Sequence, residues 1–271
     1  MPPDVLLTLF KLTVTPLLVG LASLAARRWG NTVAGLIAGL PLMTGPISIF
    51  LALEQGPAFT VATTTGILIA LTSIAGYSLA YAVAARFAPW PIAILSAYGA
   101  FFLTAWLISP LITERWQAIA CAYGAICIGI ILIPRYRLPE TPPRIPWWEI
   151  WLRMLATAAM IALVTTTASL LGPTWTGIIA TVPVLATVMA MFTHARWGHQ
   201  AVTRFIRSMM LSMIAFTTFF VIVAYGLERF GIVETYIVAT LIALIISPLV
   251  ASLDRSIAAL TTASSRKSPA G

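Results

Sequence analysis

Long apolar runs separated by short charged or proline-containing breaks make up most of this chain. Each run has roughly 20 residues, the length that crosses the hydrocarbon core of a bilayer as a helix. Nine runs can be marked, at 4–26, 32–53, 60–85, 90–109, 115–134, 149–171, 173–193, 204–226 and 233–252. We therefore expect an all-α integral membrane protein with about nine transmembrane helices.

The apolar pattern also repeats along the chain. A shift of 142 positions aligns residues 30–56 with 172–198 without a gap. A chain of this composition would give roughly two identities by chance. The alignment has eight, at Gly30/Gly172, Thr32/Thr174, Gly35/Gly177, Ile37/Ile179, Ala38/Ala180, Pro41/Pro183, Phe50/Phe192 and Gly56/Gly198. After a four-residue slip, Tyr98 aligns with Tyr236 and Ser109-Pro110-Leu111 with Ser247-Pro248-Leu249. The sequence therefore indicates two homologous units.

Each unit is predicted to be a bundle of four helices, the first in 1–112 and the second in 149–252. A connecting transmembrane helix in 113–134 and a proline-rich cytoplasmic linker in 135–148 join the units. A cytoplasmic tail, 253–271, follows, and its Ser, Thr and Ala content predicts a solvated segment. Four spans plus one is an odd number, so the second unit enters the membrane from the opposite side. Many secondary transporters are built from such inverted repeats.

Composition and charge agree with a membrane location. Hydrophobic residues make up 60% of the chain and charged residues 9%, against about 25% charged residues in soluble domains. With the N-terminus outside, thirteen of the sixteen Lys and Arg residues fall in cytoplasmic segments, and only Lys11, Arg115 and Arg229 do not. This asymmetry predicts a membrane protein with its N-terminus outside and its C-terminus in the cytoplasm. It also predicts attraction to membrane lipid, and no binding of nucleic acid.

Two of the predicted spans contain helix-breaking residues at matching positions. Pro41, Gly45 and Pro46 interrupt the span 32–53, and Pro183 interrupts the span 173–193. A proline frees a backbone carbonyl that only protein or water can satisfy inside a bilayer. Paired interrupted spans therefore indicate a transport site, although the prolines could also serve only to kink packed helices. The hydroxyls expected to contact solute there belong to Thr44, Ser48, Thr181 and Thr187.

Two basic residues occupy matching positions inside predicted spans. Lys11 lies in the first span, and Arg153 is its counterpart in the second unit. Because an embedded cation is costly, both are candidates for guiding an anionic solute toward the broken helices. The alternative is that both side chains extend to the membrane interface from nearby helix ends.

Other polar residues carry less information. His194 and His199 lie in the segment 194–199, which is predicted to be a solvated cytoplasmic loop, although a histidine can also serve as a pH switch or a metal ligand. The threonines of 63–65 and 165–167 are expected to bond to helix carbonyls one turn earlier, although they could also line a polar path. Cys121 and Cys127 lack nearby histidines, so we expect neither a metal site nor a disulfide. The sequence contains no phosphate-binding loop and no serine nucleophile motif. We therefore expect no enzyme and no cofactor.

Several short motifs resemble the small bacterial inner-membrane proteins of the GlpM family. They are Phe10-Lys11 leading an apolar helix, then Ala34-Gly35-Leu36, with Pro41 seven residues after the alanine. The likeness covers residues 8–110. In the second half Arg153 replaces the lysine and Thr176-Gly177-Ile178 replaces Ala-Gly-Leu, but Pro183 is kept. The resemblance implies a tandem version of an inner-membrane protein loosely linked to glycerol use and exopolysaccharide production, without a catalytic residue.

Two functions follow as hypotheses from these features. The first is a transporter or flippase that moves a small organic anion or an anionic lipid between the second and seventh spans. The second is a scaffold or regulatory subunit of an envelope or exopolysaccharide machine, which would dock its partner on the linker and the basic loops. The sequence leaves both open.

Overall fold

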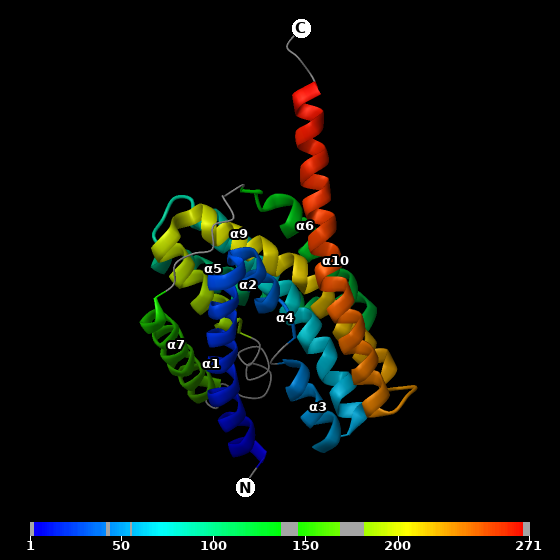
Figure 1. Cartoon of the computed structure of the whole chain (residues 1–271). Helices are drawn as coiled ribbons and strands as arrows, with labels where there is room; N and C mark the ends of the chain where they lie inside the picture. Colours follow the sequence, from blue (N-terminus) through cyan, green and yellow to red (C-terminus); the bar gives the residue numbers. More distant parts are fainter. Residues whose placement is uncertain (1–2, 42–43, 55, 137–145, 169–181, 268–271) are drawn as a thin grey trace.

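The computed structural model describes residues 3–41, 44–54, 56–136, 146–168 and 182–267, and within these ranges every regular element is a helix. The predicted all-α class is therefore confirmed (Figure 1). The elements are α1 (Pro3–Trp29), α2 (Asn31–Ala38), α3 (Thr44–Glu54), α4 (Pro57–Ala84), α5 (Trp90–Ile108), a 3₁₀ turn (Ser109–Leu111), α6 (Arg115–Leu132), α7 (Trp147–Ala168), α9 (Val184–Gly226) and α10 (Ile232–Lys267).

Five helices in the described part of the chain are long and apolar enough to cross a membrane. They are α4, α5 with its 3₁₀ turn, α6, α9 and α10. Large apolar side chains on the outer helices are exposed, such as Leu95 on α5 and Ile131 on α6, at 74% and 80%. Exposed apolar surface of this extent is typical of contact with lipid. The molecule is therefore compatible with a membrane-embedded protein.

The other predicted spans have different forms. The span 32–53 is divided between α2 and α3, and the span 173–193 is described only from residue 182. The runs 4–26 and 149–171 fall on α1 and α7, which have 27 and 22 residues but are not among the five.

Three glycines mark sharp changes of chain direction. Gly30 precedes α2, Gly56 precedes α4, and Gly198 interrupts α9, all with φ between 76° and 88° and an extended ψ. Only glycine adopts this backbone region at low cost, because a Cβ would clash with the neighbouring carbonyl groups. The prediction of a solvated loop over 194–199 is wrong, since the segment lies in α9 and only Gly198 departs from helical geometry.

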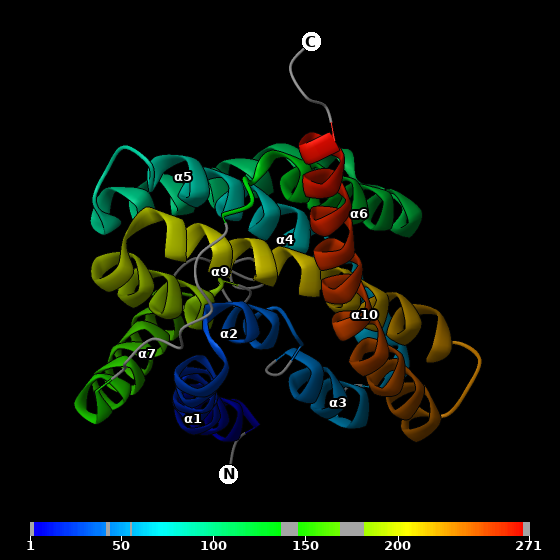
Figure 2. The same ribbon diagram turned by 45° about the horizontal axis from the view of Figure 1, so that its top comes forward.

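Helices α1 and α7 pack against each other, side by side in both views, and run in opposite directions in Figure 1 (Figures 1 and 2). The guanidinium carbon of Arg27 lies 4.7 Å from the ring centre of Trp147. One turn earlier on α1, the Ser23 Oγ lies 3.5 Å from Nη1 of Arg153. From the first contact to the second, the residue number on α7 therefore rises while the residue number on α1 falls. The two helices are antiparallel.

The short helix α2 lies directly on the backbone of α9. A Cβ on Gly39 would lie 2.5 Å from the carbonyl oxygen of Met209, and one on Gly35 would collide with the carbonyl oxygen of Phe205. Glycines four residues apart let helix backbones approach closely, which is the usual packing device inside a bilayer. Gly35 and Gly39 therefore fix where α2 sits.

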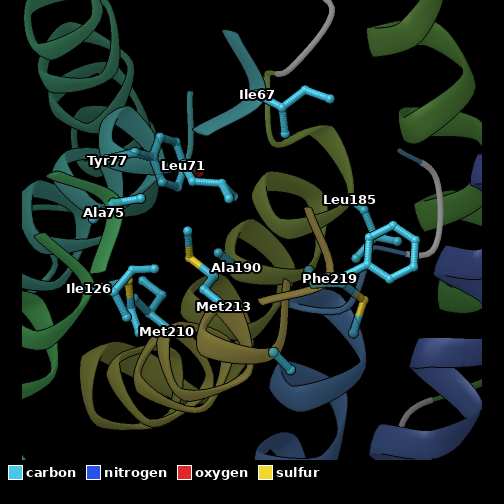
Figure 3. Packing of buried hydrophobic residues seen from close by; sticks show 14 of the residues in the cluster. Ile67, Leu71, Ala75, Tyr77, Ile126, Leu185, Ala190, Met210, Met213 and Phe219 are labelled. Carbon is cyan, nitrogen blue, oxygen red and sulfur yellow. The ribbon is translucent and has the colours of Figure 1, made fainter. Parts of the chain in front are cut away.

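The core lies where α4, α6 and α9 meet. Figure 3 shows Leu71 and Tyr77 of α4, Ile126 of α6, and Met210 and Met213 of α9 gathered in one cluster. These side chains are at most 2% exposed. The cluster joins helices from both halves of the sequence.

Helix α10 extends far beyond the predicted end of its span. It continues to Lys267, and its last turns stand clear of the other helices in Figure 1. The segment predicted as a solvated tail from residue 253 is therefore helical over the described residues 253–267. Their Ser, Thr and Ala content has only a small helix penalty once the preceding apolar turns provide the nucleus.

Candidate functional site

Both predicted helix breaks coincide with the start of a helix. At the first break, α2 ends at Ala38 and α3 begins at Thr44, with Pro41 between them. On the other side, Pro183 immediately precedes the first residue of α9, and its carbonyl accepts a 2.8 Å hydrogen bond from the Thr187 N–H. Two helix N-termini are therefore present at these positions. The Gly45 N–H donates to the Pro41 carbonyl oxygen at 2.9 Å and the Val184 N–H to the Val182 carbonyl oxygen at 2.8 Å, so the partial positive charge of the helix end is what each position offers.

Some predicted site residues lie beyond what the structure describes. Thr181 is outside the described residues, and the side chains of Lys11 and Pro46 are also outside them, although both residues are in helices.

The hydroxyls of α3 are used locally. Ser48 is buried, and its Oγ donates to the Gly45 carbonyl oxygen at 2.7 Å. Thr44 is half-buried at the first turn of α3. A Cβ on Gly45 would lie 3.5 Å from the ring of Phe219. Of these residues, Thr44 therefore remains the candidate for contact with a solute.

Thr187 joins three helices through one hydroxyl. Its Oγ1 donates to the Pro183 carbonyl oxygen at 2.8 Å and accepts from the Tyr77 and Tyr98 hydroxyls at 2.9 and 2.8 Å. A threonine hydroxyl has one proton and two lone pairs, so its capacity is filled. The Thr187 hydroxyl thus holds the start of α9 against α4 and α5.

Further polar side chains extend from Tyr77 along α4 to the part of α9 near its bend at Gly198. The ring centres of Tyr77 and Tyr81 are 6.2 Å apart, and those of Tyr81 and His194 are 5.9 Å apart. His194 is only 9% exposed. The Tyr81 hydroxyl and His194 Nδ1 are buried without a hydrogen-bond partner among the described residues. A histidine expected in solvent therefore faces the interior.

Arg153 is fully buried and faces α1 and α9. Its Nη2 donates to Oε1 of Glu149 at 2.6 Å, and its Nη1 lies 3.5 Å from both the Ser23 Oγ and the Met189 Sδ. The guanidinium does not extend to an exposed interface, because its relative exposure is zero. Sequence reasoning missed Glu149, although the i,i+4 spacing of a glutamate before an arginine is a standard signal for a helix ion pair.

A second arginine approaches the same carboxylate from α9. Nη1 of Arg196 lies 3.4 Å from Oε2 of Glu149, and the Arg196 side chain is 42% exposed. On α1, Arg27 lies one turn beyond Ser23, and its Nη1 is buried without a hydrogen-bond partner among the described residues. Two arginines, from α7 and α9, therefore face one glutamate, and Arg27 of α1 lies beside Trp147 of the same helix as Glu149.

Two other sets of ion-paired residues are structural: Asp254 with Arg207 and Arg135, and Glu228 with Arg115. Arg207 donates to the carbonyls of Ile130 and Ile133 at the end of α6 and, at 2.8 Å, to Asp254 of α10. At another point of the molecule, Arg115 donates to Glu228 at 2.7 Å. This pairing lowers the pKa of the exposed Glu228 carboxyl. Both sets of ion pairs link different helices, and neither set lies at a helix break.

Within the described residues, no group of three His, Cys, Asp or Glu side chains is placed to hold a metal ion. No family model, curated protein or solved structure matches the chain. The likeness to GlpM proteins therefore stays a prediction.

Proposed function

We propose that this protein is a multi-pass membrane transporter or flippase that moves a small organic anion or an anionic lipid. The observation that supports this most is the pair of helix starts at Thr44 and Val184. The N-terminus of a helix carries a partial positive charge and free N–H groups that attract anions. Transporters commonly place such half-helix ends around their substrate near the middle of the bilayer.

The positions of the helices support two homologous units. After Gly56, α4 has 28 residues, and after Gly198 the rest of α9 also has 28, ending at Gly226. The next helices begin at Trp90 and Ile232, 142 positions apart, and within them the alignment of Tyr98 with Tyr236 follows the four-residue slip. Equal spacing of bends and helix ends is expected if both segments descend from one ancestral unit.

Side-chain contacts follow the same correspondence. Tyr77 of α4 hydrogen-bonds to Thr187 of α9. In the alignment Tyr77 corresponds to Phe219 and Thr187 corresponds to Gly45, and a ring atom of Phe219 lies 3.5 Å from a Cβ built on Gly45. The ring centres of Tyr77 and Tyr98 are 5.5 Å apart, and those of the aligned Phe219 and Tyr236 are 6.1 Å apart. Each unit thus packs its long helix on the broken helix of the other. This reciprocity, with the antiparallel α1 and α7, supports an inverted arrangement related by a two-fold axis.

The basic residues support the proposed anionic substrate and orientation. A chain of contacts joins Arg27 to Trp147, Glu149 to Arg196, and Tyr136 to His199. The helix ends that carry most of the arginines therefore lie on one side of the molecule. In a bacterial inner membrane with nine crossings, this side would face the cytoplasm.

The test is transport by the purified protein in phosphatidylcholine liposomes. Two probes are used, [¹⁴C]succinate inside the vesicles and a fluorescent headgroup-labelled phosphatidylglycerol in the bilayer. Thr44→Trp places a bulky ring at the helix break, and Leu53→Trp places the same ring at the exposed far end of α3. We expect transport of at least one probe, lost in Thr44→Trp and kept in Leu53→Trp. Equal flux through both variants, or no flux above protein-free liposomes for either probe, would contradict the proposal.

A further inference from the structure

The arginines and the glutamate between α1, α7 and α9 form a ladder of alternating charge. From the surface inward, the exposed fractions of the side chains are 42% for Arg196, 2% for Glu149 and 0% for Arg153. Each oxygen of the carboxylate faces one arginine, at 3.4 and 2.6 Å. A group that enters from the surface meets a cation first, then the carboxylate, then a second cation. We name these three residues, together with Arg27, the arginine cluster.

The cluster has more positive than negative charge. Glu149 is the only acidic residue among the described contacts of Arg153 and Arg196. Because α1 and α7 are antiparallel, Arg27, one turn beyond Ser23, lies at about the level of Glu149. Two cations therefore share one carboxylate, and Arg27 adds a third positive charge beside Trp147. Unbalanced buried charge is costly in a low-dielectric interior, so a bound anion would stabilise the cluster.

Several polar atoms of the cluster are left without partners. Nε of Arg153, Nη1 of Arg27 and Oε2 of Glu149 are buried and have no hydrogen-bond partner among the described residues. A guanidinium offers parallel N–H groups that match a carboxylate or a phosphate, and Arg153 uses only one N–H on Glu149. The rings of Phe192 and Trp197, at 5.1 and 5.9 Å, flank the guanidinium. Its donors are thus fixed in direction but incompletely used.

We propose that the arginine cluster is an anion-binding site whose own carboxylate, Glu149, occupies it when no ligand is present. A phosphate or carboxylate group of the ligand displaces Glu149 from Arg153 and takes both arginines. The site lies to the side of the helix breaks, at the end of the molecule that carries most of the arginines. The inference rests on the proposed function for the anionic nature of the substrate, but anion binding is measurable without transport.

The experiment titrates the full-length protein in phosphatidylcholine nanodiscs with inorganic phosphate, against chloride at equal ionic strength. The midpoint of thermal unfolding reports binding, because a ligand of the folded state raises it. Glu149→Gln keeps the shape of the side chain and removes the competing charge. We expect phosphate to bind this variant about fivefold or more tightly than wild type, within the usual range of coupling between sites.

Matched variants separate this effect from general changes of charge. Glu228→Gln also removes a carboxylate paired with an arginine, but outside the cluster, and should leave phosphate binding at the wild-type value. Glu149→Gln with Arg153→Gln should abolish the phosphate effect. If Glu149→Gln does not fold, Arg196→Gln replaces it, since it removes the exposed arginine and should weaken phosphate binding.

Equal phosphate binding in wild type, Glu149→Gln and Glu228→Gln would overturn the inference, as would an Arg196→Gln variant that binds like wild type. A second titration in nanodiscs containing phosphatidylglycerol distinguishes the source of the ligand. Weaker apparent phosphate binding there assigns the site to a lipid headgroup, and unchanged binding assigns it to a free anion. Phosphate binding without any transport would leave this inference standing and remove the proposed function.

Discussion

At the scale of single residues, the described polar groups beside the helix breaks are mostly satisfied by their neighbours. The Thr187 hydroxyl uses its proton and both lone pairs on Pro183, Tyr77 and Tyr98. The Ser48 hydroxyl bonds back to the Gly45 carbonyl. A hydroxyl whose hydrogen-bonding capacity is fully used by neighbouring groups contributes mainly to the packing of the protein. The roles of these residues in packing and in transport can therefore be separated by mutation.

Replacing Thr187 by valine should destabilise the protein by about 1–3 kcal/mol, because two buried tyrosine hydroxyls lose their acceptor. Thermal unfolding in detergent measures the change. Thr217→Val is the matched control, since this buried threonine bonds only to the Met213 carbonyl of its own helix. Thr187→Ser should keep the wild-type stability more closely than Thr187→Val. Equal effects of valine at positions 187 and 217 would show that the tyrosine bonds are unimportant.

Local chemistry could be predicted from the sequence, and distant partners could not. Pro41 and Pro183 indicated helix boundaries because proline lacks a backbone donor. The back-bonds of Thr63 and Thr64, at 2.9 and 2.6 Å, confirm the prediction for these two threonines, and the side chains of 165–167 lie outside the described residues. The tyrosine partners of Thr187 lie 110 and 89 positions away, so no local pattern identifies them.

At the scale of elements, glycines decide how helices meet and turn. In a bilayer, helices gain little from burying apolar surface, so close backbone contact supplies much of their attraction. Gly35 and Gly39 give α2 this contact on α9. Alanine at position 39 should destabilise the protein by about 1–3 kcal/mol through overpacking. Gly66→Ala, on α4 with no atom within 4 Å of the new Cβ, should be neutral in the same unfolding assay.

The glycine at the bend of α9 makes a separate prediction. Gly198 and its aligned partner Gly56 have φ of 76° and 88° with an extended ψ. Alanine at either position should cost on the order of 1–3 kcal/mol in backbone strain. Unfolding midpoints of the two variants should fall by similar amounts, while Gly124→Ala, in open space on α6, should not change. A tolerated Gly198→Ala would mean that the bend does not depend on this backbone conformation.

The elements themselves were only partly predictable. Apolar runs coincide with helices in the described residues, because burial and lipid contact both select apolar residues, but the span 32–53 is divided between α2 and α3 and the span 173–193 is described only from residue 182. They did not show that α9 continues through 194–199, where polar residues and Gly198 suggested a loop. The helical extension of α10 past residue 252 was not predicted for a related reason. The residues after 252 are more polar, and the predicted helix was ended where the apolar run ends.

At the scale of the whole molecule, the account depends on two units that cross the membrane in opposite directions. The equal spacing of the bends, the reciprocal contacts and the antiparallel α1 and α7 all follow from such an arrangement. It would also place the two broken helices on a common axis, where a substrate could meet both helix starts. A parallel arrangement would place Gly56 and Gly198 at the same surface of the membrane.

The most direct test labels single cysteines on either side of the membrane, in a background with Cys121→Ala and Cys127→Ala. Ala58 and Gln200 are exposed, lie 142 positions apart and follow the two bends, and they avoid the glycines, where a cysteine would be strained. We expect a membrane-impermeant maleimide to label Ala58→Cys in intact cells and Gln200→Cys only after permeabilisation. Labelling of both positions from the same side would contradict the inverted arrangement.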